Sequence, residues 1–187
     1  MDHSCTQALV RTILEHAADH PWRMVDIGLL GLRLDERRRY RLHVWGPRCS
    51  LGDPPVHDHP YDFTSTVVVG ELTNTRYAED PVGVEYRRVR YSPPVEDART
   101  IDSVRLCATA TVLRAGDEYS QLAPELHDSR QVPGTVTLIG MSFRDPRPLT
   151  VCTAGDAPWV SGQARLATPD EVNTITGAAL DLFHSAA

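Results

Sequence analysis

Short runs of strand-forming residues, each closed by a turn, constrain the fold of this chain more than any other feature of its sequence. The runs are separated by Gly, Pro and Asp. Such spacing favours an antiparallel sandwich or barrel over alternating strands and helices. Residues 92–103, which hold two prolines and several acidic residues, are predicted to form a loop over the barrel mouth or an ordinary surface loop. The predicted strands are 38–45, 63–69, 72–78, 82–91, 103–113 and 134–143.

One helix is expected on each side of this β region. Near the N-terminus, apolar residues recur at helical spacing after Ser4 and Thr6, either of which can cap the helix. Near the C-terminus, the run from Thr168 to Glu171 contains a capping residue, a proline and an acidic first turn. The 187 residues fit one domain. It is predicted to hold an N-terminal helix at 1–22, a β-barrel at 23–160 and a C-terminal helix at 168–184.

Three histidines suggest a metal site. Alternate side chains of an extended strand share a face, so His57 and His59 can present two imidazoles to one ion. A third histidine, His127, follows much later in the chain. Neutral imidazole suits Zn, Fe, Cu and Ni, and three protein ligands leave positions open for a substrate or dioxygen. The simpler alternative is a pair of surface histidines near a proline-rich turn.

The residues around the histidines resemble the two motifs of the cupin superfamily. HDHPYDFTSTVVVG at 57–70 is similar to the first motif, and RAGDEYSQLAPELHDSRQVPGTVTL at 114–138 is similar to the second. With YRLHVWGP at 40–47, the resemblance spans about residues 38–145. It implies a single cupin-type antiparallel β-barrel, also called a double-stranded β-helix or jelly roll, that holds one metal ion.

Within the cupins, the Trp-Gly turn at Trp45, shortly before the first motif, resembles the thiol dioxygenase branch, which includes cysteine dioxygenase. That branch binds Fe(II) through three histidines. The resemblance therefore implies that His57, His59 and His127 bind Fe(II), with Zn, Ni, Mn and Cu as alternative metals.

Two departures from the family pattern limit what the resemblance implies. The usual Glu position falls on Phe63, which cannot bind a metal, and Asp62 is the nearest acidic substitute. Cysteine dioxygenases place a Ser, His and Tyr set near the iron, whereas the corresponding positions here are Thr137, Ile139 and Met141. The resemblance therefore extends to the barrel and the three histidines, and little activity on free cysteine is expected.

Strand alternation also predicts which residues surround the metal. It places Arg41, His43 and Trp45 on one face and Leu42 and Val44 on the other. If the polar face points inward, Arg41 can pair with a substrate carboxylate, and His43 can donate a hydrogen bond or act as an acid or base. Alternatively, Leu42 and Val44 face the core and Arg41 lies in water. The candidate catalytic or substrate-binding residues are Arg41, His43, Tyr61, Asp62 and Tyr119, and the candidate pocket-lining residues are Trp45, Phe63, Thr137, Ile139 and Met141.

Composition excludes several classes of function. The chain has no Lys, so it cannot form an internal Schiff base or a Walker-type phosphate loop. Its net charge of -6 argues against a nucleic-acid-binding face, and its Arg-only basic residues indicate a GC-rich bacterial genome. No apolar run is long enough to span a bilayer, and no signal peptide is evident, so a cytoplasmic protein is expected. Four widely spaced cysteines are expected to be reduced.

These observations predict a mononuclear non-haem Fe(II)-dependent cupin oxygenase or dioxygenase that acts on a small anionic metabolite. Its partners would be that metabolite and O2, with no nucleic acid and no membrane, and a homodimer stays open. One alternative is a redox-neutral, metal-dependent isomerase or lyase, in which the metal polarises a carbonyl and His43 or Tyr119 moves the proton. Another is a non-catalytic cupin that binds a small molecule.

Overall fold

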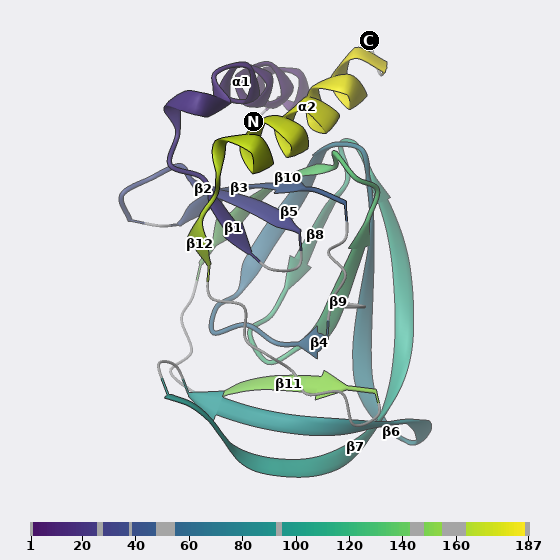
Figure 1. The fold of residues 1–187 in the computed structure, drawn as a ribbon. Coiled ribbons are helices and arrows are strands. Elements are labelled where there is room, and N and C mark those ends of the chain that lie inside the picture. The colour runs from purple at the N-terminus through teal and green to yellow at the C-terminus, as the bar shows by residue number, and fades with distance from the viewer. Residues whose placement is uncertain are drawn as a thin grey trace.

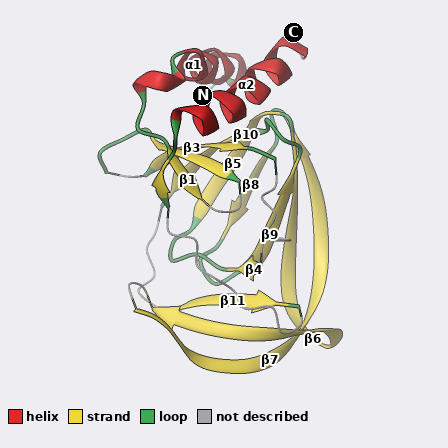
Figure 2. Ribbon diagram, in the orientation of Figure 1, coloured by secondary structure: helices red, strands yellow, loops and turns green. Residues whose placement is uncertain are grey.

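Strands dominate the structure, and the two long helices lie together at one end of it (Figures 1 and 2). It is a computed structural model that describes residues 2–25, 28–37, 39–47, 55–92, 95–142, 148–154 and 164–185. The prediction of a mostly β chain with a helix near each end is confirmed. The strands divide between two sheets, and their closure into a single cupin-type barrel stays a prediction.

The larger sheet is antiparallel and has seven strands in the order β12-β1-β2-β3-β10-β5-β8. Its central strands, β3, β10 and β5, correspond to the predicted strands 38–45, 134–143 and 63–69. The strands of this sheet are β1 (Arg23–Val25), β2 (Leu29–Arg33), β3 (Tyr40–Trp45), β5 (Phe63–Val69), β8 (Glu118–Gln121), β10 (Val136–Met141) and β12 (Arg165–Leu166).

The smaller sheet has five strands in the order β11-β4-β9-β6-β7. Its longest members, β6 and β7, form one antiparallel hairpin, whose register shifts between Glu79 and Val84. The first half of β6 pairs with β9, and its second half pairs with β11 (Figure 1). The strands of this sheet are β4 (Val56–His57), β6 (Glu71–Ser92), β7 (Val95–Arg114), β9 (Leu126–Gln131) and β11 (Leu149–Thr153).

This hairpin corrects two sequence predictions. The runs 72–78 and 82–91 belong to one strand, β6, although Pro81 lies between them and Gly83 is the second residue of the latter run. The prediction of a loop at 92–103 is wrong, because β7 begins at Val95 and pairs with β6 from there on. Residues 80–83 have no partner in β7, and pairing on both sides of them supplies backbone hydrogen bonds that outweigh the low strand propensity of the proline and acidic residues.

A glycine turn passes the chain from one sheet to the other. Gly70 links β5 to β6 with a φ of 88°, in the left-handed region that favours glycine. A Cβ at this position would lie 2.5 Å from the Thr135 hydroxyl oxygen, so no larger residue fits without movement. The turn places the first half of β6 beside β9, which carries His127.

The C-terminal helix begins with a side-chain cap, whereas the N-terminal helix has no side-chain capping hydrogen bond. Thr168 and Glu171 form a capping box: the Glu171 amide donates to Thr168 Oγ1 at 3.3 Å, and the Thr168 amide donates to the Glu171 carboxylate at 2.8 Å. The predicted cap of the C-terminal helix is thus confirmed. The N-terminal cap is Asp2, and Ser4 and Thr6 lie within the first helix. The helical elements are α1 (His3–Glu15), η1 (Ala17–Asp19, a 3-10 turn) and α2 (Pro169–Ser185).

In the described part of the chain, no helix combines the length and the apolar character needed to cross a membrane. The described cysteines Cys5, Cys107 and Cys152 are free thiols. Cys49 lies outside the described residues. Cys152 is buried in a small cluster with Val56 of β4, so its role in the fold is packing.

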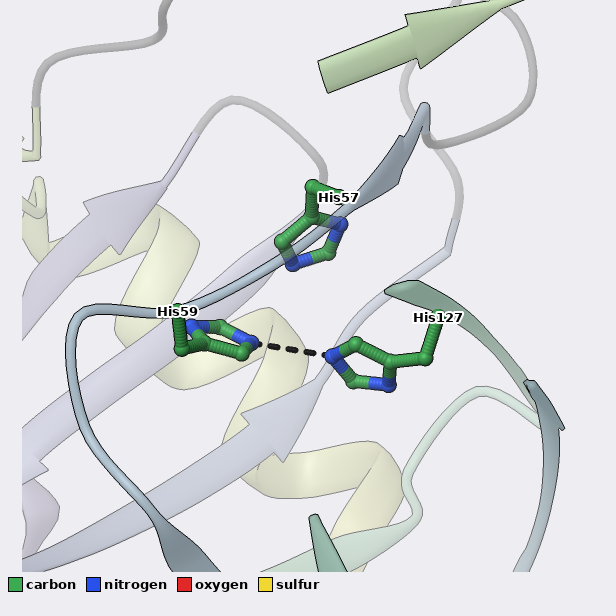
Figure 3. Close-up of side chains that lie close together, drawn as sticks. All are labelled: His57, His59 and His127. Atoms are coloured by element: carbon green, nitrogen blue, oxygen red, sulfur yellow. Dashed lines mark hydrogen bonds between the residues drawn. The ribbon is translucent and has the colours of Figure 1, made fainter. Parts of the chain in front are cut away.

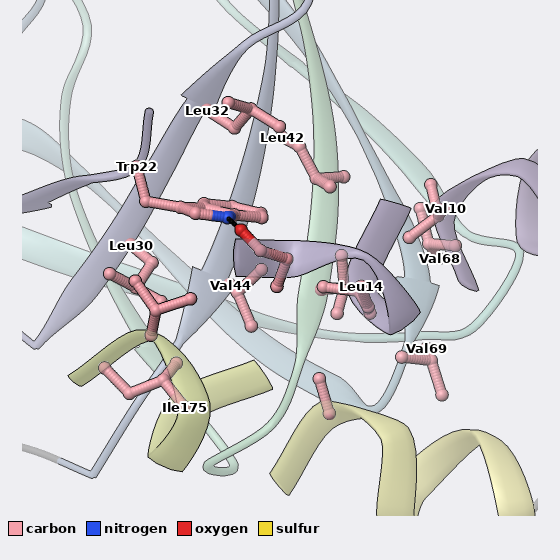
Figure 4. Packing of buried hydrophobic residues seen from close by; sticks show 14 of the residues in the cluster. Val10, Leu14, Trp22, Leu30, Leu32, Leu42, Val44, Val68, Val69 and Ile175 are labelled. Atoms are coloured by element: carbon pink, nitrogen blue, oxygen red, sulfur yellow. Dashed lines mark hydrogen bonds between the residues drawn. The ribbon is translucent and has the colours of Figure 1, made fainter. Parts of the chain in front are cut away.

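The main hydrophobic core lies between the helices and the outer face of the seven-stranded sheet (Figure 4). Leu42 and Val44 of β3 are fully buried there, together with Ile175 of α2. Trp22 is also buried in this core, and its indole N–H donates to the Ala17 carbonyl at 2.9 Å. The helices therefore cover the apolar face of β3, and the polar face of the same strand points into the molecule.

Removing a side chain from the covered face should destabilise the protein. We expect Leu42→Ala to lower the free energy of unfolding by about 2–5 kcal/mol, because it leaves a cavity in a tightly packed core. Chemical denaturation measures the change. The matched control is Leu166→Ala, at a side chain that is 66% exposed, where a change within about 0.5 kcal/mol is expected. Equal effects of the two substitutions would show that the apolar face of β3 is not packed as described.

Candidate metal centre

Three histidines from separate positions in the chain converge inside the molecule (Figure 3). His57 ends β4 and lies directly opposite His127 of β9, and His59 follows shortly after β4. One ring nitrogen from each residue lies within 4.8 Å of those of the other two. The Nε2 atoms of His59 and His127 are 2.9 Å apart. Two nitrogens bound to one ion at about 2.1 Å and at right angles would be about 3 Å apart, so this pair suits adjacent positions on one metal.

His57 and His59 do not share a face of one strand, contrary to the prediction from strand alternation. Because β4 ends at His57, His59 is not on the same strand, and its ring reaches the centre from the segment that leads to β5. The ring centroids of His57 and His59 are 4.8 Å apart and steeply inclined. Asp58, between them, is buried and accepts a hydrogen bond from the Thr150 amide of β11 at 2.8 Å. This bond fixes the segment that carries both histidines.

Hydrogen bonds determine which nitrogen of two histidines can bind a metal. His57 Nδ1 lies 3.0 Å from the Pro55 carbonyl oxygen, and His127 Nδ1 lies 2.9 Å from Asn74 Oδ1. Both oxygens are acceptors only, so each Nδ1 carries the proton. The Nε2 atoms of His57 and His127 then carry no proton and can bind an ion, and in the structure His127 Nε2 accepts a hydrogen bond from His59 Nε2 at 2.9 Å. Asn74 was not a sequence candidate, because it lies in an ordinary polar run of β6 and nothing local marks it.

Burial keeps the three imidazoles neutral. Desolvation lowers the pKa of His57, although the Pro55 carbonyl and nearby Asp58 and Asp128 oppose the shift. The pKa values of His59 and His127 fall well below the ordinary range, first through burial and then through the neighbouring rings and arginines. Neutral imidazole is the form that binds a metal ion. The donor set therefore fits a divalent transition metal in both geometry and protonation.

Two polar side chains, Arg41 and His43, lie on the inner face of β3. Arg41 is half-buried, and its guanidinium carbon lies 5.7 Å from the centre of the Tyr61 ring. Within the described residues, Arg41 Nε and His43 Nδ1 are enclosed and form no hydrogen bond. Burial, assisted by Arg41, lowers the pKa of His43 to about 3. His43 is therefore neutral at physiological pH.

Aromatic rings form the wall beside His59. The Tyr61 ring stacks on the His59 ring with centroids 5.2 Å apart, and the Phe63 ring meets it edge-on at 5.1 Å. Tyr119 of β8 contacts Phe63 from the other side, with ring centroids 5.9 Å apart. Burial raises the pKa of Tyr119, so its phenol stays protonated. Asp62 is used elsewhere, because its carboxylate accepts a hydrogen bond from the Ala123 amide at 2.7 Å.

The β10 positions expected to line the site lie on the strand between β3 and β5. Thr137 pairs with His43 and is fully buried, and its hydroxyl accepts a hydrogen bond from the Trp45 indole at 3.3 Å. Ile139 is also buried, and Met141 is half-buried at the end of the strand. Since directly paired residues share a face of the sheet, Thr137 lies on the same side of the sheet as His43.

Acid should destabilise the protein through His43. Its pKa falls from 6.5 to about 3 on folding, so between these values the unfolded chain binds more protons than the folded one. The contribution of neutral His43 to the free energy of unfolding is fully present above pH 6.5, and it is lost as the pH falls towards 3. Chemical denaturation at a series of pH values across this range measures the effect. In His43→Gln, the free energy of unfolding should fall less steeply with decreasing pH than in the parent protein, by up to about 1.4 kcal/mol per pH unit. Identical slopes would contradict a buried, neutral His43.

Comparison with known proteins finds distant structural likenesses. No family model matches the chain, and no curated protein matches it. Among solved structures, it is similar to Drosophila melanogaster CENP-C bound to CAL1, with 13% identity and a TM-score of 0.42, over 75% of this chain and 100% of that one. It is also similar to a cupin-like protein from Thermotoga maritima, with 15% identity and a TM-score of 0.28, over 82% and 87% of the two chains.

Proposed function

We propose that this chain is a cupin-type, non-haem Fe(II)-dependent oxygenase that acts on a small anionic metabolite. The observation that carries the proposal is the group of three converging histidines, His57, His59 and His127. In the described residues no carboxylate joins this group. Three histidine ligands alone would leave coordination positions on the ion for a substrate or dioxygen. The motifs around the histidines support the closure of the two sheets into one cupin barrel.

The donor set suits several metals, and Fe(II) is the one proposed. Imidazole nitrogen binds Fe, Zn, Ni and Cu, and Mn is an alternative. The bound ion would supply a Lewis-acid centre that holds substrate and dioxygen next to each other. The chain's own residues would hold the ion and enclose the reaction. Tyr61 and Phe63 shield one side of His59, and Trp45 and Thr137 form a hydrogen-bonded pair in the interior.

The anionic substrate is inferred from Arg41. A buried guanidinium nitrogen without a partner is costly, so an inward Arg is usually matched by an acid or an anionic ligand. In the part of the chain that the structure describes, no carboxylate pairs with Arg41. A substrate carboxylate would fill this role. Neutral His43, two residues along the same face, can then donate or accept one hydrogen bond.

The main alternative is a redox-neutral isomerase or lyase that uses the same metal site. The observation that favours it is the enclosed, neutral imidazole of His43, which could donate or accept a hydrogen bond at a substrate carbonyl that the metal would polarise. With a pKa of about 3, His43 is too weak a base to take the proton by itself, so Tyr119 would be the group that moves it. Oxygen uptake by the protein with a panel of small carboxylic acids distinguishes the two activities. Uptake that depends on added Fe(II) supports the oxygenase. Conversion without uptake supports the isomerase or lyase, and binding without conversion supports a non-catalytic binding module.

Removing one histidine should remove the metal. We expect His127→Ala to lose most of the bound divalent metal, because two remaining imidazoles form a much weaker site. Elemental analysis of purified protein after loading with Fe(II) under anaerobic conditions measures the content. The matched control is His16→Ala, at an exposed histidine of the N-terminal region, which should keep the full content. Unchanged metal in His127→Ala would refute the three-histidine assignment.

Replacing the inward arginine should weaken substrate binding without loss of metal. We expect Arg41→Met to raise KM for an anionic substrate by about 10-fold to 100-fold, which is the size of a lost charge-assisted hydrogen bond. Steady-state kinetics and metal analysis are measured on the same preparations. Arg11→Met, which removes an exposed Arg paired with Glu15, serves as the control. An unchanged KM for Arg41→Met would argue against an anionic substrate.

A further inference from the structure

We infer that Asn74 is a positioning residue of the metal centre, which fixes the proton of His127 on Nδ1 and adds no charge beside the histidine ligands. This inference rests on the proposed metal-binding function and extends it to a residue of β6. Asn74 is 3% exposed, and its Oδ1 lies 2.9 Å from His127 Nδ1. Within a buried site, such a bond determines which ring nitrogen is available to an ion.

The sheet register brings the amide to the ring. Strand β6 pairs with β9 so that Asn74 lies opposite Ser129 and Arg76 lies opposite His127. Asn74 and His127 are therefore diagonal neighbours, and their side chains lie on the same face. The Ser129 hydroxyl donates to the same Asn74 oxygen at 3.5 Å. The Asn74 oxygen faces both His127 Nδ1 and the Ser129 hydroxyl, so it accepts a hydrogen bond from the Nδ1–H group of His127.

The opposite amide orientation would have the opposite consequence. If the Asn74 NH2 group faced His127, it would donate to Nδ1, and the ring proton would move to Nε2. Nε2 could then not bind an ion without losing that proton. The observed orientation is the one that leaves Nε2 available, and the same nitrogen lies 2.9 Å from His59 Nε2.

The chemical type of the partner also matters. The Nδ1 atoms of His57 and His127 both donate to neutral oxygens, from Pro55 and Asn74 respectively. A carboxylate in place of Asn74 would make the His127 imidazole a stronger electron-pair donor to the metal. It would also reduce the net positive charge around the ion. The nearest acid on β9, Asp128, instead accepts a hydrogen bond from the Tyr77 hydroxyl at 2.8 Å. A neutral partner keeps the positive charge of the ion available for an anionic substrate.

Metal affinity tests the positioning role. Competition with a chelator should show that Asn74→Ala binds Co(II) about 10-fold to 100-fold more weakly than the parent protein. Asn74→Asp, which can still accept the Nδ1 proton, should restore the affinity. It should also bind azide at the Co(II) more weakly than the parent protein, as followed in the optical spectrum. Thr75→Ala, at the next residue of β6, is the control and should match the parent protein.

Nitrogen-15 NMR of the histidine rings in the metal-free parent protein tests the tautomer directly and needs no variant. We expect His127 to carry its proton on Nδ1 and to lose this fixed tautomer in Asn74→Ala. A proton on Nε2, or equal metal affinities for Asn74→Ala and the parent protein, would overturn the inference about Asn74. Failure of the parent protein to bind any divalent metal would instead overturn the proposed function, and the NMR result would still decide the tautomer.

Discussion

The pairing of His57 with His127 across β4 and β9 is the contact on which the rest of the site depends. Strand β4 has only two residues, so it owes its position to its neighbours. On its other side it pairs with β11, where Val151 lies opposite His57, and Val56 packs in a small core with Cys152. The hydrogen bond from the Thr150 amide to Asp58 holds the next residue. A short, firmly anchored segment thus presents two of the three imidazoles.

The two faces of β3 explain how the same fold is stable and leaves a polar interior. Its outer side chains, Leu42 and Val44, are buried beneath the helices and supply hydrophobic stabilisation. Its inner side chains include Arg41 and His43, whose enclosed nitrogens require a partner or remain unsatisfied. Unsatisfied buried polar groups raise the free energy of the folded state. The hydrophobic stabilisation on the helix-covered face offsets this cost. The cost is the physical basis for expecting a ligand there.

The sequence predicts those features whose cause is local. The strand 63–69 and the capping box at Thr168 follow from local pattern and chemistry, and the structure contains both. The continuation of β6 through Pro81 and Gly83 depends on pairing with β7, so the local turn signal was misleading. The contact of Asn74 with His127 depends on the register between β6 and β9. That register depends on the pairing of segments far apart in the chain, so local sequence patterns do not predict it.

The most direct test of a three-histidine centre is X-ray absorption at the metal edge of protein loaded with Fe(II) under anaerobic conditions. The structure predicts an inner shell of nitrogen and oxygen at about 2.1 Å, with the outer-shell scattering of about three imidazole rings. A shell containing sulfur, imidazole scattering from fewer than two rings, or a protein that retains no metal would contradict it.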